Sequence, residues 1–340
     1  MVDLTIDLNS FSFESSLGDD EKELEVIRAR SNQLTICGCA HAAFLCRLSH
    51  SLRENAKRHH ESGGNMNDLT LRVGILGLGR IGKQLLTSLL ETTGMHPTQI
   101  NISTRRPESS ADCSQRGVEC YFDNIRLAAW ADVLFLCFLP CNLASVGADL
   151  RTHLPKHCLV YSFITAVPPK RLANILGHSF ILKPQYDFVT GETTDLWKSS
   201  YGIASALRDP VMIKASCPVE MSGGLSLDQK WVSGVLYSLL NICTSACLAS
   251  RDTLVLINNL FQLNAPQEFT TQSYINSAHA SSLSPDEPFP WINLIDVHMK
   301  DTPLSLFISR SPNIPAAISM AYKSTATTEK PHSPMSNFLS

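Results

Sequence analysis

Residues 72–82 read Arg-Val-Gly-Ile-Leu-Gly-Leu-Gly-Arg-Ile-Gly, and this stretch decides the fold. The apolar run Leu71–Leu76 predicts a β-strand, the glycines follow in the pattern G-x-G-x-x-G, and Arg80–Leu90 has the periodicity of a helix. Such a glycine pattern is informative only when a strand precedes it and a helix follows it. Both conditions hold, so the stretch is typical of a βα unit that binds a dinucleotide.

Each glycine of the pattern has its own task in such a unit. Gly77 permits the tight turn from strand to helix, Gly79 lets the backbone approach a pyrophosphate, and Gly82 lets the helix pack on the strand. The amides at the helix start and the helix dipole favour the phosphate charge. A glycine-rich turn without a ligand is the alternative. The predicted pyrophosphate site is the whole turn: Leu76, Gly77, Leu78, Gly79, Arg80, Ile81 and Gly82.

From this turn to about residue 187, short β-rich runs alternate with helical stretches. Strands are expected at 71–76, 99–104, 118–122, 133–139, 158–163 and 179–182, and helices at 80–90, up to 116, at 142–150 and at 170–176. Several strands are continuous apolar runs, which is typical of a parallel sheet that helices bury on both faces. Right-handed crossovers then favour an α/β fold of the Rossmann type, with a doubly wound parallel sheet.

The flanking sequence predicts further parts. Residues 1–20 are polar and acidic and are expected to be disordered, and residues 21–68 are expected to form a helical extension and a linker. Residues 69–190 are the predicted Rossmann domain, 191–322 a second, mostly helical C-terminal domain, and 323–340 a disordered tail. Within the second domain we expect helices at 231–250 and 252–263, a turn at Ser250 and a proline-rich loop at 284–290.

Composition and charge exclude several classes of function. The 340 residues carry 28 basic and 31 acidic side chains, and the net charge of −3 provides no basic field for nucleic acid. The longest apolar run, Val133–Pro140, has eight residues. A helix that spans a bilayer needs about 20, so no membrane partner is expected.

The cysteines and the N-terminal stretch indicate a cytoplasmic location. The eleven cysteines are scattered and lie mostly in apolar segments, a pattern typical of reduced thiols. The acidic first 25 residues match neither a secretory signal nor a mitochondrial transit peptide. Cys37-Gly-Cys39-Ala-His41 has no second ligand pair at zinc-like spacing, so we expect it to be buried in a helix and expect no metal site.

The end of the second predicted strand indicates which dinucleotide fits. An NAD site places an acidic residue about 20 residues beyond the glycines, where this chain reads Ser103-Thr104-Arg105-Arg106-Pro107. Hydroxyl and guanidinium groups bind a 2′-phosphate through charge-assisted hydrogen bonds, whereas an acid would repel it. We therefore expect NADP as the cofactor, with Thr104, Arg105 and Arg106 at its 2′-phosphate. One arginine is expected at the phosphate, with the other available to stack on adenine; a solvated loop is the alternative.

Five segments in the same order resemble the pyrroline-5-carboxylate reductase family. They span roughly residues 71–182, about a third of the chain, and comprise Val73–Gly79, Ser103–Arg106, Gly117–Asn124, Ala131–Pro140 and Val160–Val167. The resemblance implies that Asn124 contacts the adenosine half of NADP and that Leu139 and Pro140 belong to a segment under the dinucleotide. It implies that Phe163, Ile164 and Thr165 lie near the nicotinamide. The expected function is hydride transfer between NADPH and a C=N or C=O bond of a small metabolite.

The substrate half departs from that family. Leu139 stands where the family has lysine, Lys183–Asp187 replaces its Met-Pro-Asn-Thr-Pro segment, and its Gly-Ser-Gly-Pro-Ala segment has no counterpart. A non-catalytic NADP(H)-binding sensor or interaction protein is therefore the alternative function. We expect the oxidoreductase, with a small-molecule substrate and a second copy of the chain in a homodimer as its partners.

Candidates for the chemistry lie just beyond the last predicted strand, at the sheet edge where open α/β sheets bind ligands. Tyr186 or Lys183 can donate a proton to an imine or carbonyl, and Asp187 lies beside them. The alternative is that this segment is only a loop that leads away from the sheet and has no catalytic role. The catalytic residue therefore stays unassigned. The histidines without an identifiable partner are expected at the surface or in packing positions, namely His41, His59, His60, His153, His157, His178 and His298.

Overall fold

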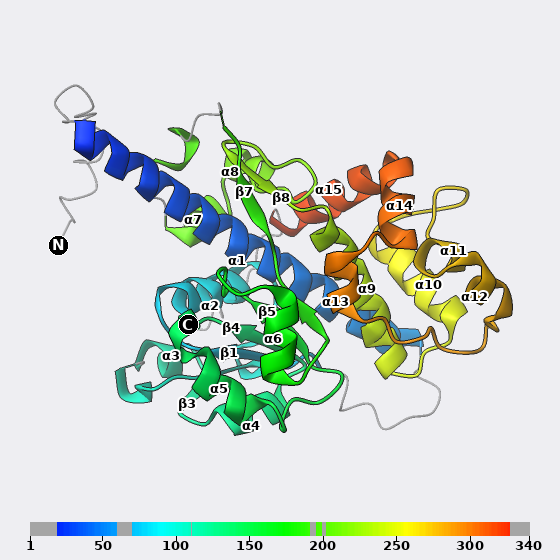
Figure 1. Ribbon diagram of the computed structural model, residues 1–340, viewed down its shortest axis with the longest axis horizontal. Coiled ribbons are helices and arrows are strands. Elements are labelled where there is room, and N and C mark those ends of the chain that lie inside the picture. The colour runs from blue at the N-terminus through cyan, green and yellow to red at the C-terminus, as the bar shows by residue number, and fades with distance from the viewer. Residues whose placement is uncertain (1–18, 60–69, 110, 191–194, 199–201, 327–340) are drawn as a thin grey trace, which may run out of the picture.

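A computed structural model describes residues 19–59, 70–109, 111–190, 195–198 and 202–326 (Figure 1). Six parallel strands form one sheet in the order β3-β2-β1-β4-β5-β6. They are β1 (Val73–Leu76), β2 (Ile100–Ser103), β3 (Glu119–Tyr121), β4 (Val133–Leu136), β5 (Leu159–Ser162) and β6 (Ile181–Leu182). All six lie within the predicted strand ranges, and the strand order is that of a doubly wound Rossmann sheet. The predicted fold class is thus confirmed.

Helices cover both faces of the sheet, because alternate side chains of each strand point to opposite faces. On one face, Leu134 and Val160 pack against α4 (Asn124–Trp130), α5 (Leu143–Leu150) and α6 (Pro169–Leu176). On the other face, Phe135 and Tyr161 join a core with α1 (Asp19–His59), α2 (Arg80–Thr92) and α9 (Lys230–Ser245). Short helices η4 (Pro97–Gln99), η5 (Pro107–Ser109), η6 (Pro140–Asn142) and α3 (Ala111–Gln115) complete the crossovers.

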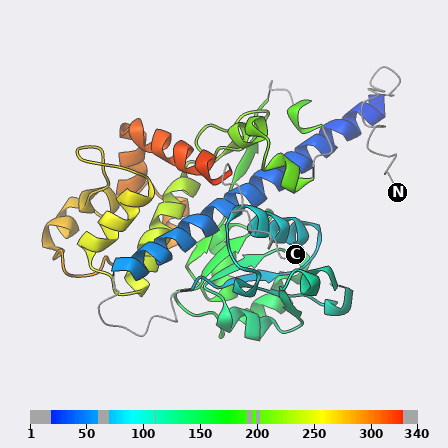
Figure 2. The same cartoon turned by 180° about the vertical axis from the view of Figure 1, so that it is seen from behind.

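Helix α1 is a central element of the fold. It runs between the sheet and the C-terminal helices (Figure 2). Gly38 lies against Phe163 at the C-terminal edge of the sheet, and Arg53 reaches Asp132 at the N-terminal edge. Residues 36–46 are almost entirely buried, so this segment is apolar on every side, as expected for a helix inside a core. Its Cys37-Gly-Cys39-Ala-His41 sequence is buried in the helix, as predicted.

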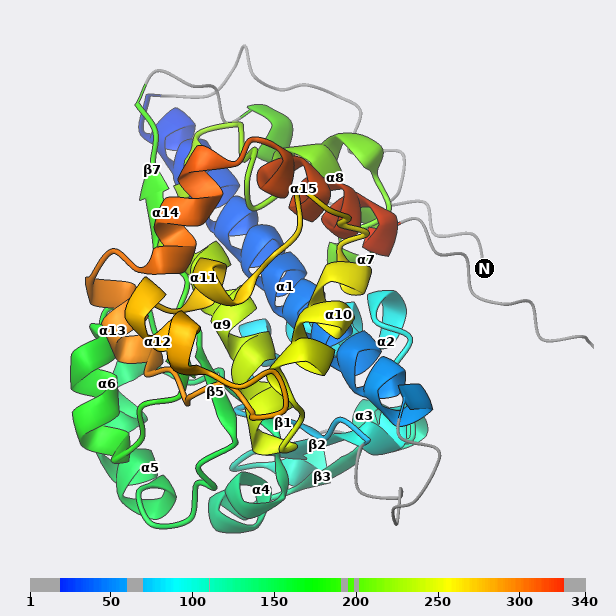
Figure 3. The same cartoon turned by 90° about the vertical axis from the view of Figure 1, so that its right-hand side faces the viewer.

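The C-terminal region is mostly helical and packs against α1 and the sheet (Figure 3). Its helices are η7 (Asp195–Trp197), α7 (Ile203–Ala206), α8 (Pro210–Ala215), α9, α10 (Ser250–Leu260), α11 (Thr271–Tyr274), α12 (Ser277–Ser282), α13 (Leu294–Met299), α14 (Pro303–Arg310) and α15 (Asn313–Ala326). A small antiparallel sheet pairs β7 (Tyr186–Phe188) with β8 (Leu225–Leu227). In the described part of the chain, no helix has both the length and the apolar character needed to cross a membrane.

Several local predictions were wrong. The sequence does not predict α4, which has seven residues. Asp123 caps its start, because the Asp123 carboxylate accepts a hydrogen bond from the Arg126 amide. The sequence also does not predict β7 and β8, because their pairing joins segments far apart in the chain. The turn expected at Ser250 lies at residues 246–249, where Cys247 adopts a left-handed φ of 54°.

The predicted disordered ends and linker lie largely outside the described residues. Residues 19 and 20 belong to α1, and residues 323–326 continue α15, so these positions are helical rather than disordered. Residues 1–18, 60–69 and 327–340 are not described. The proline-rich loop at 284–290 is confirmed as irregular structure.

Candidate functional site

The glycine turn after β1 has the backbone that the sequence requires. Gly77 adopts a φ of 100°, which only glycine adopts freely, and a Cβ there would lie 2.7 Å from the carbonyl oxygen of Cys137. A Cβ at Gly82 would collide with the carbonyl of Gly77. By contrast, nothing lies within 4 Å of a Cβ built at Gly79. The turn therefore packs tightly on its inner side and is open at Gly79.

The open side of the turn faces the start of α2. Gly79 is the residue before the helix, and no side chain caps the amides of the first turn. No acidic residue lies in that turn either, and Arg80 is exposed. Free helix amides and the helix dipole favour an anion at such a position. Leu78, in contrast, is buried in the core, so only its backbone can meet a ligand.

The loop after β2 lies directly beside the glycine turn. Leu76 and Ser103 are paired in register, and the amide of Gly77 donates to the carbonyl of Ser103 at 2.8 Å. Thr104 follows, partly buried, with its amide 2.9 Å from the carbonyl of Tyr121. Arg105 and Arg106 are exposed at the same edge. The structure therefore brings the two halves of the predicted phosphate site together.

Asn124, the first residue of α4, connects the end of β2 to α5. Its Oδ1 accepts a hydrogen bond from the Ser103 hydroxyl at 2.8 Å, and its Nδ2 donates to Asp149 at 3.0 Å. The same Ser103 hydroxyl accepts from the amide of Asp123 at 3.3 Å. Asn124 thus lies at the predicted edge of the sheet and ties the end of β2 to α5.

Exposed apolar side chains also lie at this edge. Leu139, the residue before η6, is 69% exposed, and Pro140 is exposed beside it. Phe122 is 62% exposed at the end of β3, and Ile125 is 40% exposed in the first turn of α4. Phe122 and Ile125 are not among the site residues predicted from the sequence. Their position just after a strand was a usable signal, since that is where ligands of such sheets bind.

The ends of β5 and β6 form the other part of the edge. Phe163 packs against α1, where a Cβ at Gly38 would lie 3.1 Å from its ring. Ile164 is buried in the core, and Thr165 is exposed. The ammonium of Lys183, just after β6, donates to the carbonyl of Thr165 at 2.8 Å. These residues thus lie close together. The side chain of Ile164, however, is buried in the core.

Lys183 is a buried cation that lies just after β6. The residue is only 5% exposed. Among the described residues, no carboxylate pairs with its ammonium group. Burial lowers its pKa, because removal from water disfavours the ammonium form. The carbonyl of Thr165 takes one of its three N–H donors. The remaining donors can serve a bound group.

Tyr186 is engaged by a residue on α1. Its hydroxyl lies 2.7 Å from Nδ1 of His41, and Nε2 of His41 lies 2.8 Å from the carbonyl of Ser216. Burial lowers the pKa of His41 to about 4, so the ring is neutral at pH 7. A carbonyl only accepts, so Nε2 carries the proton and Nδ1 accepts from the hydroxyl of Tyr186. Burial also raises the pKa of Tyr186, which keeps that hydroxyl protonated.

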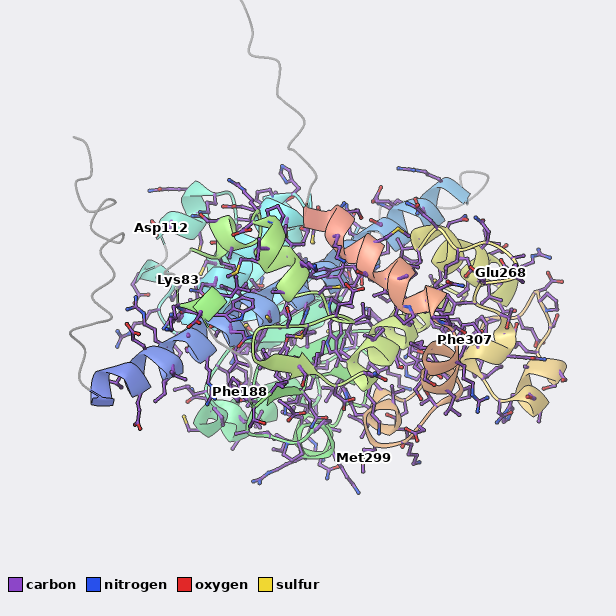
Figure 4. The ribbon with its side chains drawn as sticks, turned by 90° about the horizontal axis from the view of Figure 1, so that it is seen from above. Lys83, Asp112, Phe188, Glu268, Met299 and Phe307 are labelled. Atoms are coloured by element: carbon purple, nitrogen blue, oxygen red, sulfur yellow. The ribbon has the colours of Figure 1, made fainter. Side chains whose placement is uncertain are left out.

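The other residues that the sequence singled out lie apart from Lys183 and Tyr186. Asp187 is exposed on β7, and its neighbour Phe188 lies beside the N-terminal half of α1 (Figure 4), with the Arg30 guanidinium 4.8 Å from its ring. The described histidines occupy surface or packing positions, as predicted: His41, His153, His157, His178 and His298. The side chain of His59 and all of His60 lie outside the described residues.

Comparison with known proteins places this chain among oxidoreductases. The family model described as NADP oxidoreductase coenzyme F420-dependent matches residues 72–176. A mouse protein named NADP-dependent oxidoreductase domain-containing protein 1 is 36% identical over 94% of this chain and 93% of its own length. Pyrroline-5-carboxylate reductase from Escherichia coli strain K12 is 30% identical over 32% of this chain and 40% of its own length.

Solved structures give more distant matches. A pyrroline-5-carboxylate reductase from Coxiella burnetii is 14% identical, with a TM-score of 0.33 over 75% of this chain and 96% of that one. A Plasmodium falciparum pyrroline carboxylate reductase with NADP bound is 12% identical, with a TM-score of 0.32 over 75% of this chain and 95% of that one.

Proposed function

The chain belongs to the family of NADP-dependent oxidoreductase domain-containing protein 1, and from this premise we propose that it transfers a hydride between NADPH and a C=N or C=O bond of a small metabolite. One observation carries the proposal. The open glycine turn lies beside a loop with two exposed arginines and no acid before Glu108. That combination suits a dinucleotide with a 2′-phosphate.

The residues at the first part of the edge fit the adenosine half of NADP, and we name this part the adenosine end: Gly77–Gly82, Thr104–Arg106 and Asn124. The uncapped amides of α2 would hold the pyrophosphate. Thr104, Arg105 and Arg106 would hold the 2′-phosphate. The exposed Leu139, with Phe122 and Ile125, provides apolar surface for the adenine ring.

The residues after β5 and β6 fit the nicotinamide half, and we name this part the nicotinamide end: Phe163–Thr165, Lys183 and Tyr186. Bound NADPH supplies the hydride. Gly38 matters here, because a larger residue would displace the ring of Phe163. Helix α1 thus acts as a wall of the nicotinamide end.

Lys183 is the better of the two predicted proton donors. The hydroxyl proton of Tyr186 is already committed to Nδ1 of His41, whereas Nζ of Lys183 has donors to spare. A lowered pKa brings an ammonium closer to neutrality, which suits a general acid. As the carbon accepts the hydride, Nζ would give a proton to the nitrogen or oxygen of the same bond. Nζ then regains a proton from solvent.

A cytoplasmic location and a homodimer complete the proposal. All eleven cysteines are free thiols, and burial raises the pKa of most of them, which suits a reducing compartment. Light scattering of the purified chain would report its assembly state, and a monomer at working concentration would contradict the homodimer.

The decisive experiment is turnover. The purified full chain is mixed with NADPH and a panel of small imines and carbonyl compounds, including pyrroline-5-carboxylate, and the NADPH absorbance is followed. Steady, enzyme-dependent loss of absorbance supports the oxidoreductase. Saturable NADPH binding without turnover on any panel member would instead support the alternative, a non-catalytic NADP(H)-binding sensor.

A further inference from the structure

The N-terminal end of α1 projects beyond the rest of the molecule (Figure 1) and leaves two large apolar side chains uncovered. Leu24 is 63% exposed and Ile27 is 61% exposed, whereas Ala29 and Gln33 are fully buried. At about 100° per residue, Leu24 lies about 180° around the helix from Gln33, and Ile27 lies about 160° from Ala29. Leu24 and Ile27 therefore form an apolar face that points away from the rest of the molecule, and we name it the outer face of α1.

Charge is divided unevenly along this end of α1. Residues 19–25 include five acidic side chains and one lysine, whereas residues 26–34 include two arginines and no acidic side chain. Glu23 and Arg30 are both exposed and lie seven residues apart, so they flank the outer face on the same side. The Arg30 guanidinium lies 4.8 Å from the centre of the Phe188 ring (Figure 4), and this contact holds it at the edge of the outer face.

This pattern is complementary to itself when a second copy is turned end to end. Leu24 and Ile27 occupy a and d positions of a heptad, and Glu23 and Arg30 occupy successive g positions. In an antiparallel pair, Leu24 of each copy lies against Ile27 of the other, and g positions face g positions. Glu23 of each copy then meets Arg30 of the other. The same patch serves both copies, as a two-fold symmetric interface requires.

The surroundings of α1 favour the antiparallel direction. Residues 35–46 are buried on every side, so a second helix parallel to α1 would run into the C-terminal helices there. An antiparallel helix overlaps residues 19–32 alone, about 21 Å at 1.5 Å per residue, and its own molecule then lies beyond the free end of α1. An overlap this short buries less than a standard interface of about 800 Å² per partner, so the pairing is expected to be weak and reversible.

We propose that two copies of this chain pair through the outer face of α1, with their helices antiparallel. This inference rests on the homodimer in the proposed function and assigns its interface. The contact removes Leu24 and Ile27 of both copies from water, which drives the association. The two pairs of Glu23 with Arg30 set the direction and the register.

Sedimentation equilibrium of the full chain, from about 1 to 500 µM, tests the interface without NADPH. The unaltered chain should show a reversible equilibrium between monomer and dimer. Ile27→Glu should weaken the dimer at least about 100-fold, because it places a carboxylate in the apolar contact of both copies. Leu306→Glu changes a 46% exposed leucine on α14 and is the matched control, which should dimerise like the unaltered chain.

A charge exchange tests the antiparallel direction. Arg30→Glu alone brings two carboxylates together at each end of the contact, and Glu23→Arg alone brings two guanidinium groups together. Each should weaken the dimer roughly 3- to 10-fold, since two exposed pairs become repulsive. The combined variant restores both pairs with their signs exchanged, so its dimer should be within about 2-fold of the unaltered one.

The outcomes separate this interface from the rest of the proposed function. A chain that stays monomeric over the whole range overturns both the interface and the homodimer. A dimer that Ile27→Glu leaves equally strong overturns the interface and keeps the homodimer. A combined variant no stronger than the two single variants overturns the antiparallel pairing. Turnover of NADPH is measured separately, so its absence does not affect the result.

Discussion

The adenosine end and the nicotinamide end lie on the same edge of one sheet, but they are assembled differently. The adenosine end comes from loops within residues 76–124, which follow consecutive strands. The nicotinamide end depends on α1, because Gly38 packs on Phe163 and His41 bonds Tyr186 across 145 residues of sequence. The comparison teaches that one end follows from a local motif, whereas the other requires the whole chain to fold around α1.

The largest expected effect breaks the nicotinamide end without harming the adenosine end. Lys183→Met removes the proposed proton donor, so kcat should fall by roughly 10²- to 10⁴-fold while the Kd for NADPH changes little. Stopped-flow turnover and NADPH titration measure the two quantities. Lys300→Met, at a 70% exposed lysine, is the control. Unchanged kcat in Lys183→Met would remove Lys183 from the chemistry.

The converse change breaks the adenosine end alone. Gly79→Asp places a carboxylate at the open start of α2, where it caps the helix and repels the pyrophosphate. We expect about 100-fold or greater loss of NADPH affinity, from two or more lost charged hydrogen bonds, with no loss of thermal stability.

Gly202→Asp is the matched control for that change. Gly202 also precedes a helix, with nothing within 4 Å of a built Cβ. It should bind NADPH normally. Equal affinity in Gly79→Asp and the unaltered chain would show that the turn does not hold the pyrophosphate.

A pH experiment sharpens the account of the α1 wall. The pKa of His41 falls from 6.5 unfolded to about 4 folded, so its contribution to stability is complete above pH 6.5 and is lost as the pH falls towards 4. Between pH 7 and pH 5 this amounts to about 2 kcal/mol of unfolding free energy. Urea unfolding at both pH values should show that loss, and His41→Phe should show a smaller pH dependence. A slope identical in both proteins would contradict the buried neutral imidazole.

Sequence reasoning reached the adenosine end because its constraints are contiguous. The φ of Gly77, the close approach at Gly82 and the loop after Ser103 all follow from a strand, a turn and the next strand. It did not find the partner of His41, because no spacing rule links α1 to β7. The open position of Phe122 also escaped, although its place after β3 was a readable sign.

The central claim is that the glycine turn and the loop after β2 together bind a 2′-phosphate, and the most direct test compares NADPH with NADH. The Kd of each is measured for the unaltered chain, for the double variant Arg105→Ala with Arg106→Ala, and for Arg171→Ala on α6 as a control. We expect the double variant to bind NADPH roughly 10- to 100-fold more weakly, with NADH little changed. Equal losses for NADPH and NADH, or no loss for either, would contradict the claim.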